Sequence, residues 1–231
     1  MSDEPTPAED LNALIARVDP DRWLSSRFIV DPTARDDVVA LYAYDHELAR
    51  APYIASNPLL GEVRLTWWRE VLDEIFEGRP VRRHPTAQAL AVAVERRSLP
   101  RAPLEAMIDA RYRELDPAPL DADEALAWAQ SSGGEAAALA LAVLDPGSPR
   151  DAAMVAGAAW ALARRAADEP QLKNEVGRLM RKARDGARQV SAEGFPALAH
   201  AVFAPGRAQG RPPSRLLSRM RIVWAVARGR L

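Results

Sequence analysis

Helix-forming segments follow one another along the whole chain, and prolines separate them. Alanine, leucine and arginine dominate these segments, and all three residue types favour the α-helix. No stretch sustains the alternation of apolar and polar residues that is typical of a half-buried strand. Because 231 residues are enough to bury a core, the sequence predicts a single all-α domain.

Prolines and capping residues set the limits of the expected helices. Asn57 followed by Pro58 is an N-cap with proline at the first helical position, and the helix that it opens should end near Gly78. Pro52 should end the preceding helix. We expect the other helices over residues 21–30, 32–52, 85–97, 100–115, 121–144 and 170–190, after the turn at 145–148, near Phe195 and after Pro212–Pro213.

Two of these segments, residues 136–144 and 152–163, are apolar almost all the way round. Such helices belong in the middle of a bundle, where their alanines allow close packing or leave room for a ligand. The longer segment falls short of the roughly 20 residues of a membrane-spanning helix. The acidic start MSDEPTPAED is unlike a signal peptide, so a cytoplasmic protein is expected. We expect a flexible acidic segment at 1–19, the helical domain at 20–205 and a basic amphipathic helix at 206–231.

Composition excludes several kinds of chemistry. With 31 basic and 32 acidic side chains, the molecule as a whole has no field that attracts nucleic acid. The chain has no cysteine, which removes disulfides, thiol nucleophiles and thiolate-bound zinc. Its three histidines are scattered along the sequence and do not suggest a metal site.

Several short motifs stand out in the N-terminal half. The most distinctive is Gly-Glu-Val-Arg-Leu-Thr-Trp-Trp-Arg at residues 61–69. The others are the segments 21–24, 41–44, 84–85 and 108–111 and the residue Arg35. Over residues 20–165 the chain resembles the squalene/phytoene synthase family, all-α prenyltransferases that join two isoprenyl diphosphates head to head. The resemblance implies an isoprenoid-synthase-like helical bundle.

The resemblance also implies magnesium sites, because the leaving diphosphate of that reaction needs a hard cation held by carboxylates. The first aspartate motif, Asp-Asp-x-x-Asp, falls on residues 49–53, which read Ala-Arg-Ala-Pro-Tyr. In the second motif, aligned through Gly157, only Asp168 keeps an aspartate. We therefore expect no catalytic residue, no metal ligand and no cofactor. Mg²⁺ is expected only if the chain is an active prenyltransferase after all.

Charged and aromatic residues of the matched segments remain, and two interpretations stay open. They form arginine–carboxylate pairs that fix how helices meet, or they line a residual ligand pocket. Arg64 and Trp68 share a helical face, which favours a seam against a neighbouring helix with Asp21 or Asp109 as partner of the arginines. The candidate ligand-binding residues are Arg35, Tyr44, Arg64, Trp68, Arg69 and Asp109. Of the adjacent Trp67 and Trp68, one should fill the core and the other face a groove or the surface.

The missing aspartates, the compact length and the 61–69 motif are similar to a noncatalytic branch of the family, the mitochondrial complex I assembly factor-like proteins. This resemblance implies an auxiliary protein with a protein partner, such as a respiratory complex subunit, that works peripherally on the inner membrane. Two alternatives stay open. One is an active head-to-head prenyltransferase, and the other is a non-catalytic isoprenoid-binding protein.

The C-terminal segment carries a strong charge bias. Residues 206–231 hold seven arginines and no acid, so this segment is +7 while the rest of the chain is −8. One apolar stripe along its helix comprises Leu216, Leu217, Met220, Val223 and Trp224. The helix lies on an anionic membrane surface or a partner, or it packs on the bundle with its arginines in water. No motif for nucleic-acid recognition accompanies it.

Overall fold

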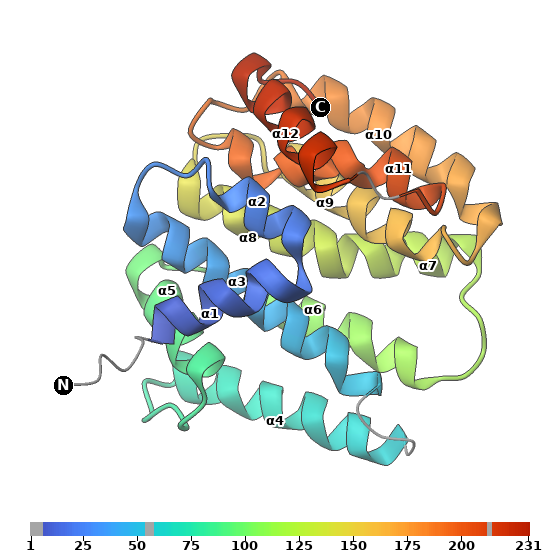
Figure 1. The fold of residues 1–231 in the computed structure, drawn as a ribbon. Helices are drawn as coiled ribbons and strands as arrows, with labels where there is room; N and C mark the ends of the chain where they lie inside the picture. Colours follow the sequence, from blue (N-terminus) through green and yellow to red (C-terminus); the bar gives the residue numbers. More distant parts are fainter. Residues whose placement is uncertain (1–6, 54–57, 212–213) are drawn as a thin grey trace.

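The computed structural model describes residues 7–53, 58–211 and 214–231, which form a bundle of helices (Figure 1). Its centre is made by α3 (Pro32–Arg50), α8 (Glu135–Leu144) and α9 (Arg150–Arg165). Most residues of α8 and of α9 are buried, and most of these are alanine. The small side chains let neighbouring helices approach closely, which confirms the expected position of these two helices.

Helix α3 begins and ends where its prolines require. The Asp31 side chain caps it by accepting a hydrogen bond from the Thr33 N–H at 3.0 Å, and Pro32 occupies the first helical position. The helix ends at Arg50, and a 3₁₀ turn, Ala51–Tyr53, carries the chain past Pro52. Eight consecutive residues of its middle, 38–45, are buried, which makes α3 a central helix of the core.

The remaining helices cover this centre. The lower part of Figure 1 holds α4 (Pro58–Phe76), at its outer edge, and α5 (Pro85–Arg97). Between them and the centre lie α1 (Pro7–Val18) and α6 (Arg101–Tyr112), whereas α2 (Pro20–Ser26) lies above α3, toward the upper end. The upper end is formed by α10 (Lys173–Ala187), α11 (Ala204–Ala208) and α12 (Arg215–Arg228). Among the described residues, no helix combines the length and the apolarity needed to cross a bilayer.

The expectation of a flexible segment at 1–19 is wrong for residues 7–18. They form α1, which buries Leu11 and Ile15 in the core, 4% and 0% exposed. The four acids among the first ten residues give the segment a tail-like composition, but apolar side chains follow them at helical spacing. Residues 1–6 lie outside the described part of the chain.

The expected helix at 121–144 is interrupted by a π-helical turn, Gln130–Gly134, between α7 (Ala122–Ala129) and α8. Here the backbone at Gly133 comes very close to Gly157 of α9. A Cβ on Gly157 would overlap the Gly133 carbonyl and lie 2.7 Å from Ala137 Cβ. Glycine at both positions permits this crossing, and it brings the turn to the edge of the cavity described next.

Candidate functional site

A cavity of about 530 Å³ lies between α2, α3, α7, the π-helical turn and α9. Its walls carry arginines and carboxylates beside the indole rings of Trp128 and Trp160. The size lies within the range of small-molecule sites, which is roughly 300–1,000 Å³. What the cavity can bind depends on which of these charged groups are already paired.

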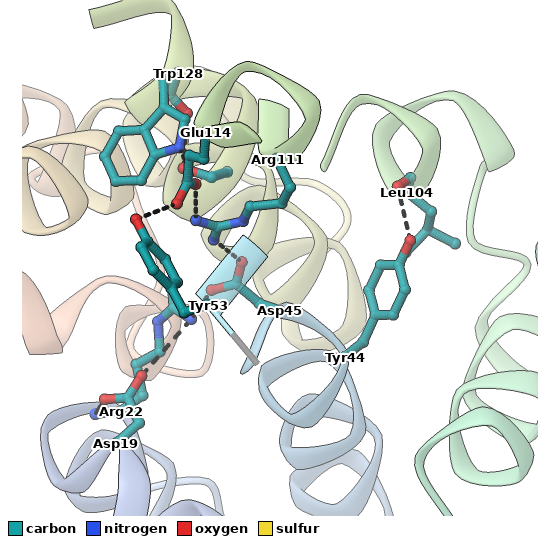
Figure 2. A network of polar contacts seen from close by, with 10 residues as sticks. Asp19, Arg22, Tyr44, Asp45, Tyr53, Leu104, Arg111, Glu114 and Trp128 are labelled. Carbon is teal, nitrogen blue, oxygen red and sulfur yellow. Dashed lines mark hydrogen bonds and ion pairs between the residues drawn. The ribbon is translucent and has the colours of Figure 1, made fainter. Parts of the chain in front are cut away.

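The Asp45 carboxylate on α3 is bound on both oxygens (Figure 2). Arg22 Nη1 of α2 donates to Oδ2 at 2.6 Å, and Arg111 Nη2 of α6 donates to Oδ1 at 2.8 Å. All three side chains are buried. The guanidinium of Arg22 also stacks over Trp160, 4.2 Å from the ring centroid, which holds it at the cavity wall.

The Glu114 carboxylate is occupied in the same way (Figure 2). Its Oε1 accepts from Arg111 Nη1 at 2.7 Å and from Trp128 Nε1 at 2.6 Å. Its Oε2 accepts from the Tyr53 hydroxyl at 2.9 Å. Because Arg111 joins Glu114 to Asp45, a single polar network runs along the cavity from α2 to α7.

Burial and charge act against each other in this network. Burial alone would raise the pKa of the Asp45 carboxyl, but the charges of Arg22 and Arg111 hold it well below its usual range. Burial raises the pKa of nearby Asp19, and Arg22 and Arg164 only partly offset that effect. Burial, reinforced by the Arg22 charge, lowers the pKa of His200 well below its ordinary value. Asp45 is therefore the fixed negative charge to which both buried arginines are bound.

The residues that line the cavity do not fit a magnesium site. Ala49, Arg50 and Tyr53, at the positions where the resemblance implies the first aspartate motif, do line the cavity. Arg50 pairs with Glu47, and the Tyr53 hydroxyl donates a hydrogen bond to Glu114. Within the described residues, no group of three carboxylate, histidine or cysteine side chains is placed to hold a metal ion.

At the second motif, the alignment again leads to the cavity wall. Arg164, Arg165, Asp168 and Glu169 all line it. Arg165 binds Oε1 of Glu169 at 2.8 Å, Oε2 of Glu169 is buried without a hydrogen-bond partner among the described residues, and Asp168 is exposed. Oxygen ligands that are bound by guanidinium groups are not free to replace the water shell of Mg²⁺.

Some hydrogen-bond donors beside the cavity also lack a partner. Arg22 Nε and Nη2 and Arg111 Nε are buried without a hydrogen-bond partner in the described structure. Arg22 Nη2 is 3.4 Å from where a Cβ on the cavity-lining Gly133 would lie. Arg164 stacks on Trp160 at 4.9 Å and has no ion pair within the described part of the chain. The cavity can therefore accept an anionic or hydrogen-bond-accepting group.

None of the six candidate ligand-binding residues lines this cavity. Arg35 donates to the Ile29 carbonyl at 3.2 and 2.9 Å and so fixes the turn before α3. Tyr44 is fully buried and donates to the Leu104 carbonyl at 2.9 Å (Figure 2). As the neighbour of Asp45 on α3, Tyr44 points to a different side of that helix.

Arg69 and Asp109 form an ion pair between α4 and α6, as the seam interpretation expected. Both side chains are partly exposed, and the Arg69 guanidinium lies 5.5 Å from the Tyr112 ring centroid. Asp21, the other expected partner of these arginines, instead accepts a hydrogen bond from Trp160 Nε1 at 3.1 Å and pairs with Arg207.

Arg64 and Trp68 line a second hollow of about 360 Å³, with Trp67 and His84 beside them. Trp68 is 4% exposed and Trp67 half-buried, which confirms that one of the pair fills the core and the other faces a groove. Arg64 is exposed, so the expectation that it belongs to a buried seam is wrong. Four residues of spacing put Arg64 and Trp68 on neighbouring parts of α4, but the helix rotates Arg64 out of the core.

The network residues Arg22, Asp45 and Arg111 belong to, or directly follow, the segments 21–24, 41–44 and 108–111 that carry the family resemblance. The motifs therefore pointed to the segments that hold the polar network. The sequence did not show which side chains bind each other, because the Arg22–Asp45 and Arg111–Asp45 contacts join positions 23 and 66 residues apart.

Comparisons with known proteins agree with this architecture. A model of the squalene/phytoene synthase family matches residues 15–181. A dehydrosqualene synthase, solved in complex with ligand, superposes with a TM-score of 0.75 and 14% identity over 96% of this chain and 95% of its own. A squalene synthase from Alicyclobacillus acidocaldarius gives a TM-score of 0.59 and 16% identity over 96% of this chain and 94% of its own.

Two curated relatives are similar over a shorter segment. They are the NADH dehydrogenase (ubiquinone) complex I, assembly factor 6 of Bos taurus and of Homo sapiens, 30% and 29% identical over 103 residues. The matched segment is 45% of this chain and 30% of each relative.

Proposed function

The chain belongs to the squalene/phytoene synthase family, and from that premise we propose that it is a non-catalytic member that acts as an auxiliary protein. The observation that carries the proposal is the occupation of Asp45 and Glu114 by arginine, tryptophan and tyrosine donors. Chemistry that expels diphosphate needs free carboxylates to hold a cation against the leaving group. In this chain, arginine, tryptophan and tyrosine side chains bind the Asp45 and Glu114 carboxylates instead.

The proposal predicts that the purified protein releases no pyrophosphate from farnesyl or geranylgeranyl diphosphate in the presence of Mg²⁺. A heat-denatured sample sets the background, and an active dehydrosqualene synthase in the same assay shows that the substrates and the metal are competent. Turnover above that background would contradict the proposal and support the alternative of an active head-to-head prenyltransferase.

We propose further that the protein assists a respiratory complex and works at the surface of the membrane that carries it. The similarity over 103 residues to complex I assembly factor 6 of cattle and humans supports this proposal. In the organism that encodes the protein, deletion of its gene should lower the amount of assembled NADH dehydrogenase on native gels. Complementation by the intact gene should restore it, whereas normal assembly in the deletion strain would contradict the proposal.

A second candidate function is binding of an isoprenoid diphosphate, or a similar anionic ligand, without turnover. The unpartnered N–H groups of the buried Arg22 and Arg111 at the cavity favour it. Farnesyl diphosphate added without metal should then raise the melting temperature of the wild type, and Arg164→Gln should weaken that effect because Arg164 is an exposed, unpaired cation at the same wall. A melting temperature that farnesyl diphosphate leaves unchanged would exclude this ligand.

A further inference from the structure

Helix α12 has two opposite apolar faces. One face packs on the bundle through Ile222 and Ala225, which are 0% and 4% exposed. The other face is exposed to solvent, with Met220 60% and Trp224 60% exposed. At 100° per residue, Met220 lies about 160° around the helix from Ile222, so the exposed face points away from the bundle. This exposed face, called the outer stripe below, consists of Leu216, Leu217, Met220, Val223 and Trp224, each at least half exposed.

Arginines border the outer stripe on both edges. In the helical projection Arg219 falls on one edge, and Arg221 and Arg228 fall on the other. The Arg228 guanidinium carbon lies 3.7 Å from the Trp224 ring centroid, so charge and indole are held together. Residues 206–231 contain no acidic side chain. Within the described part of the chain, none of these three arginines has an ion pair.

The positive charge extends beyond α12. Residues 173–231 contain 13 basic and 3 acidic side chains, whereas residues 1–172 contain 18 basic and 29 acidic ones. Figure 1 shows α10, α11 and α12 at the same end of the bundle. On α10 the side chains of Arg181, Lys182 and Arg184 are exposed. The molecule is therefore polarised, with its cationic charge concentrated at the end that carries the outer stripe.

We propose that the outer stripe docks on an anionic lipid bilayer, with α12 lying in the plane of the membrane surface. Leu216, Met220 and Trp224 would enter the boundary between headgroups and acyl chains, and Arg219 and Arg221 would bind headgroup phosphates on either side. The inference deepens the proposed function, because an auxiliary protein of a membrane complex has to reach the bilayer.

The charges favour a bilayer over a second copy of this chain. A two-fold dimer brings the same patch of both copies together, so the arginines that border each stripe would meet arginines. An anionic bilayer offers negative charge over the whole contact and an apolar layer beneath it. A protein partner would need both an apolar groove and acidic rims on two sides, which is a more special requirement.

The first test is flotation of the full chain with vesicles. The protein should bind vesicles of phosphatidylcholine and phosphatidylglycerol, bind pure phosphatidylcholine much less, and be released as salt rises. Arg219→Gln with Arg221→Gln should weaken binding roughly 25-fold, because each arginine near an anionic surface contributes about fivefold. Met220→Ser with Trp224→Ser should weaken it roughly tenfold or more. Val30→Ser with Val92→Ser is the matched control, since it removes exposed apolar side chains elsewhere and should leave binding unchanged.

The second test identifies the helix that enters the lipid. Trp224 is more exposed than the other five tryptophans, which are buried or half-buried. Anionic vesicles with brominated acyl chains should therefore quench part of the tryptophan fluorescence, and Trp224→Phe should abolish that quenching while the protein still floats with the vesicles.

Three results would overturn the proposal. The first is that the wild type does not bind anionic vesicles. The second is that Met220→Ser with Trp224→Ser binds them as well as the wild type does. The third is a concentration-dependent dimer of the wild type in ultracentrifugation that the same double variant abolishes. The vesicles contain no respiratory complex, so an absence of vesicle binding would not contradict the proposed role in assembling that complex. Normal assembly of NADH dehydrogenase in the deletion strain, in turn, would not contradict the binding of α12 to lipid.

Discussion

Arg111 and Asp45 lie 66 residues apart in the sequence, yet Arg111 Nη2 donates to Asp45 Oδ1 at 2.8 Å between two buried side chains. The same carboxylate accepts from Arg22 on its other oxygen. One residue of α3 thus ties α2 and α6 to the central helix of the bundle. The charge of this residue is compensated only as long as both arginines stay in place.

Removal of the Asp45 carboxylate should therefore be costly. Asp45→Ala leaves two buried guanidinium groups without their anion, and we expect the free energy of unfolding to fall by about 3–5 kcal/mol. Asp109→Ala is the matched control, because its ion pair with Arg69 is partly exposed and should contribute less than about 1 kcal/mol. Urea unfolding followed by circular dichroism measures both. Equal losses in the two variants would contradict the central role of Asp45.

His200 should make stability depend on pH. It is fully buried, and burial together with the Arg22 charge lowers its pKa, so it stays neutral in the folded protein. In the unfolded chain it takes up a proton below about pH 6.5. The unfolded state then binds more protons, and the free energy of unfolding should fall by roughly 1 kcal/mol between about pH 7.5 and about pH 5.5.

His200→Leu should remove that part of the dependence, since leucine does not titrate and can pack against Tyr42 and Trp160, which the histidine ring contacts edge-on. The comparison is between the slopes of unfolding free energy against pH in the two proteins. Parallel slopes would show that His200 does not carry this effect.

The crossing of the π-helical turn and α9 should tolerate no side chain. Gly157→Ala places a methyl group against Ala137 and the Gly133 carbonyl, and we expect a loss of about 1–3 kcal/mol or more. Gly177→Ala is a matched control on α10, where the nearest atom, Arg181 Nη1, is 3.8 Å away. That change should stabilise the protein by about 0.5–1 kcal/mol, because alanine favours the helix over glycine. Thermal melting should separate the two variants in opposite directions, and a shift of the same sign would argue against the close crossing.

Arg64→Ala should change the free energy of unfolding by less than about 0.5 kcal/mol, because the side chain is exposed. Trp68→Ala, one turn further along α4, should cost about 3–5 kcal/mol, since that ring is buried against Tyr44 at a centroid distance of 5.2 Å. Chemical denaturation of the two variants distinguishes a surface position from a core position. A large loss in Arg64→Ala would restore the seam interpretation.

The sequence predicted most of the helices because local signals determine them. Pro85 and Pro32 each mark an expected helix start that the structure has at the same place. The π-helical turn could not be foreseen, because it depends on the contact between Gly133 and a residue of another helix, Gly157. The polar network at the cavity could not be predicted for the same reason. Asp45 directly follows the segment 41–44, but its ion pairs form only when the fold brings Arg22 of α2 and Arg111 of α6 to it.

The π-helical turn at Gln130–Gly134 holds one residue more than an α-helical path between the same ends would need. Deletion of one residue from this turn should therefore let α7 and α8 join as one continuous α-helix whose flanking parts keep their places in the bundle. The change would be confined to the turn, where Ser132 and Gly133 line the cavity. Relatives of this chain that lack one residue in this region should thus keep the packing of α8 on α9 and differ in the shape of the cavity wall.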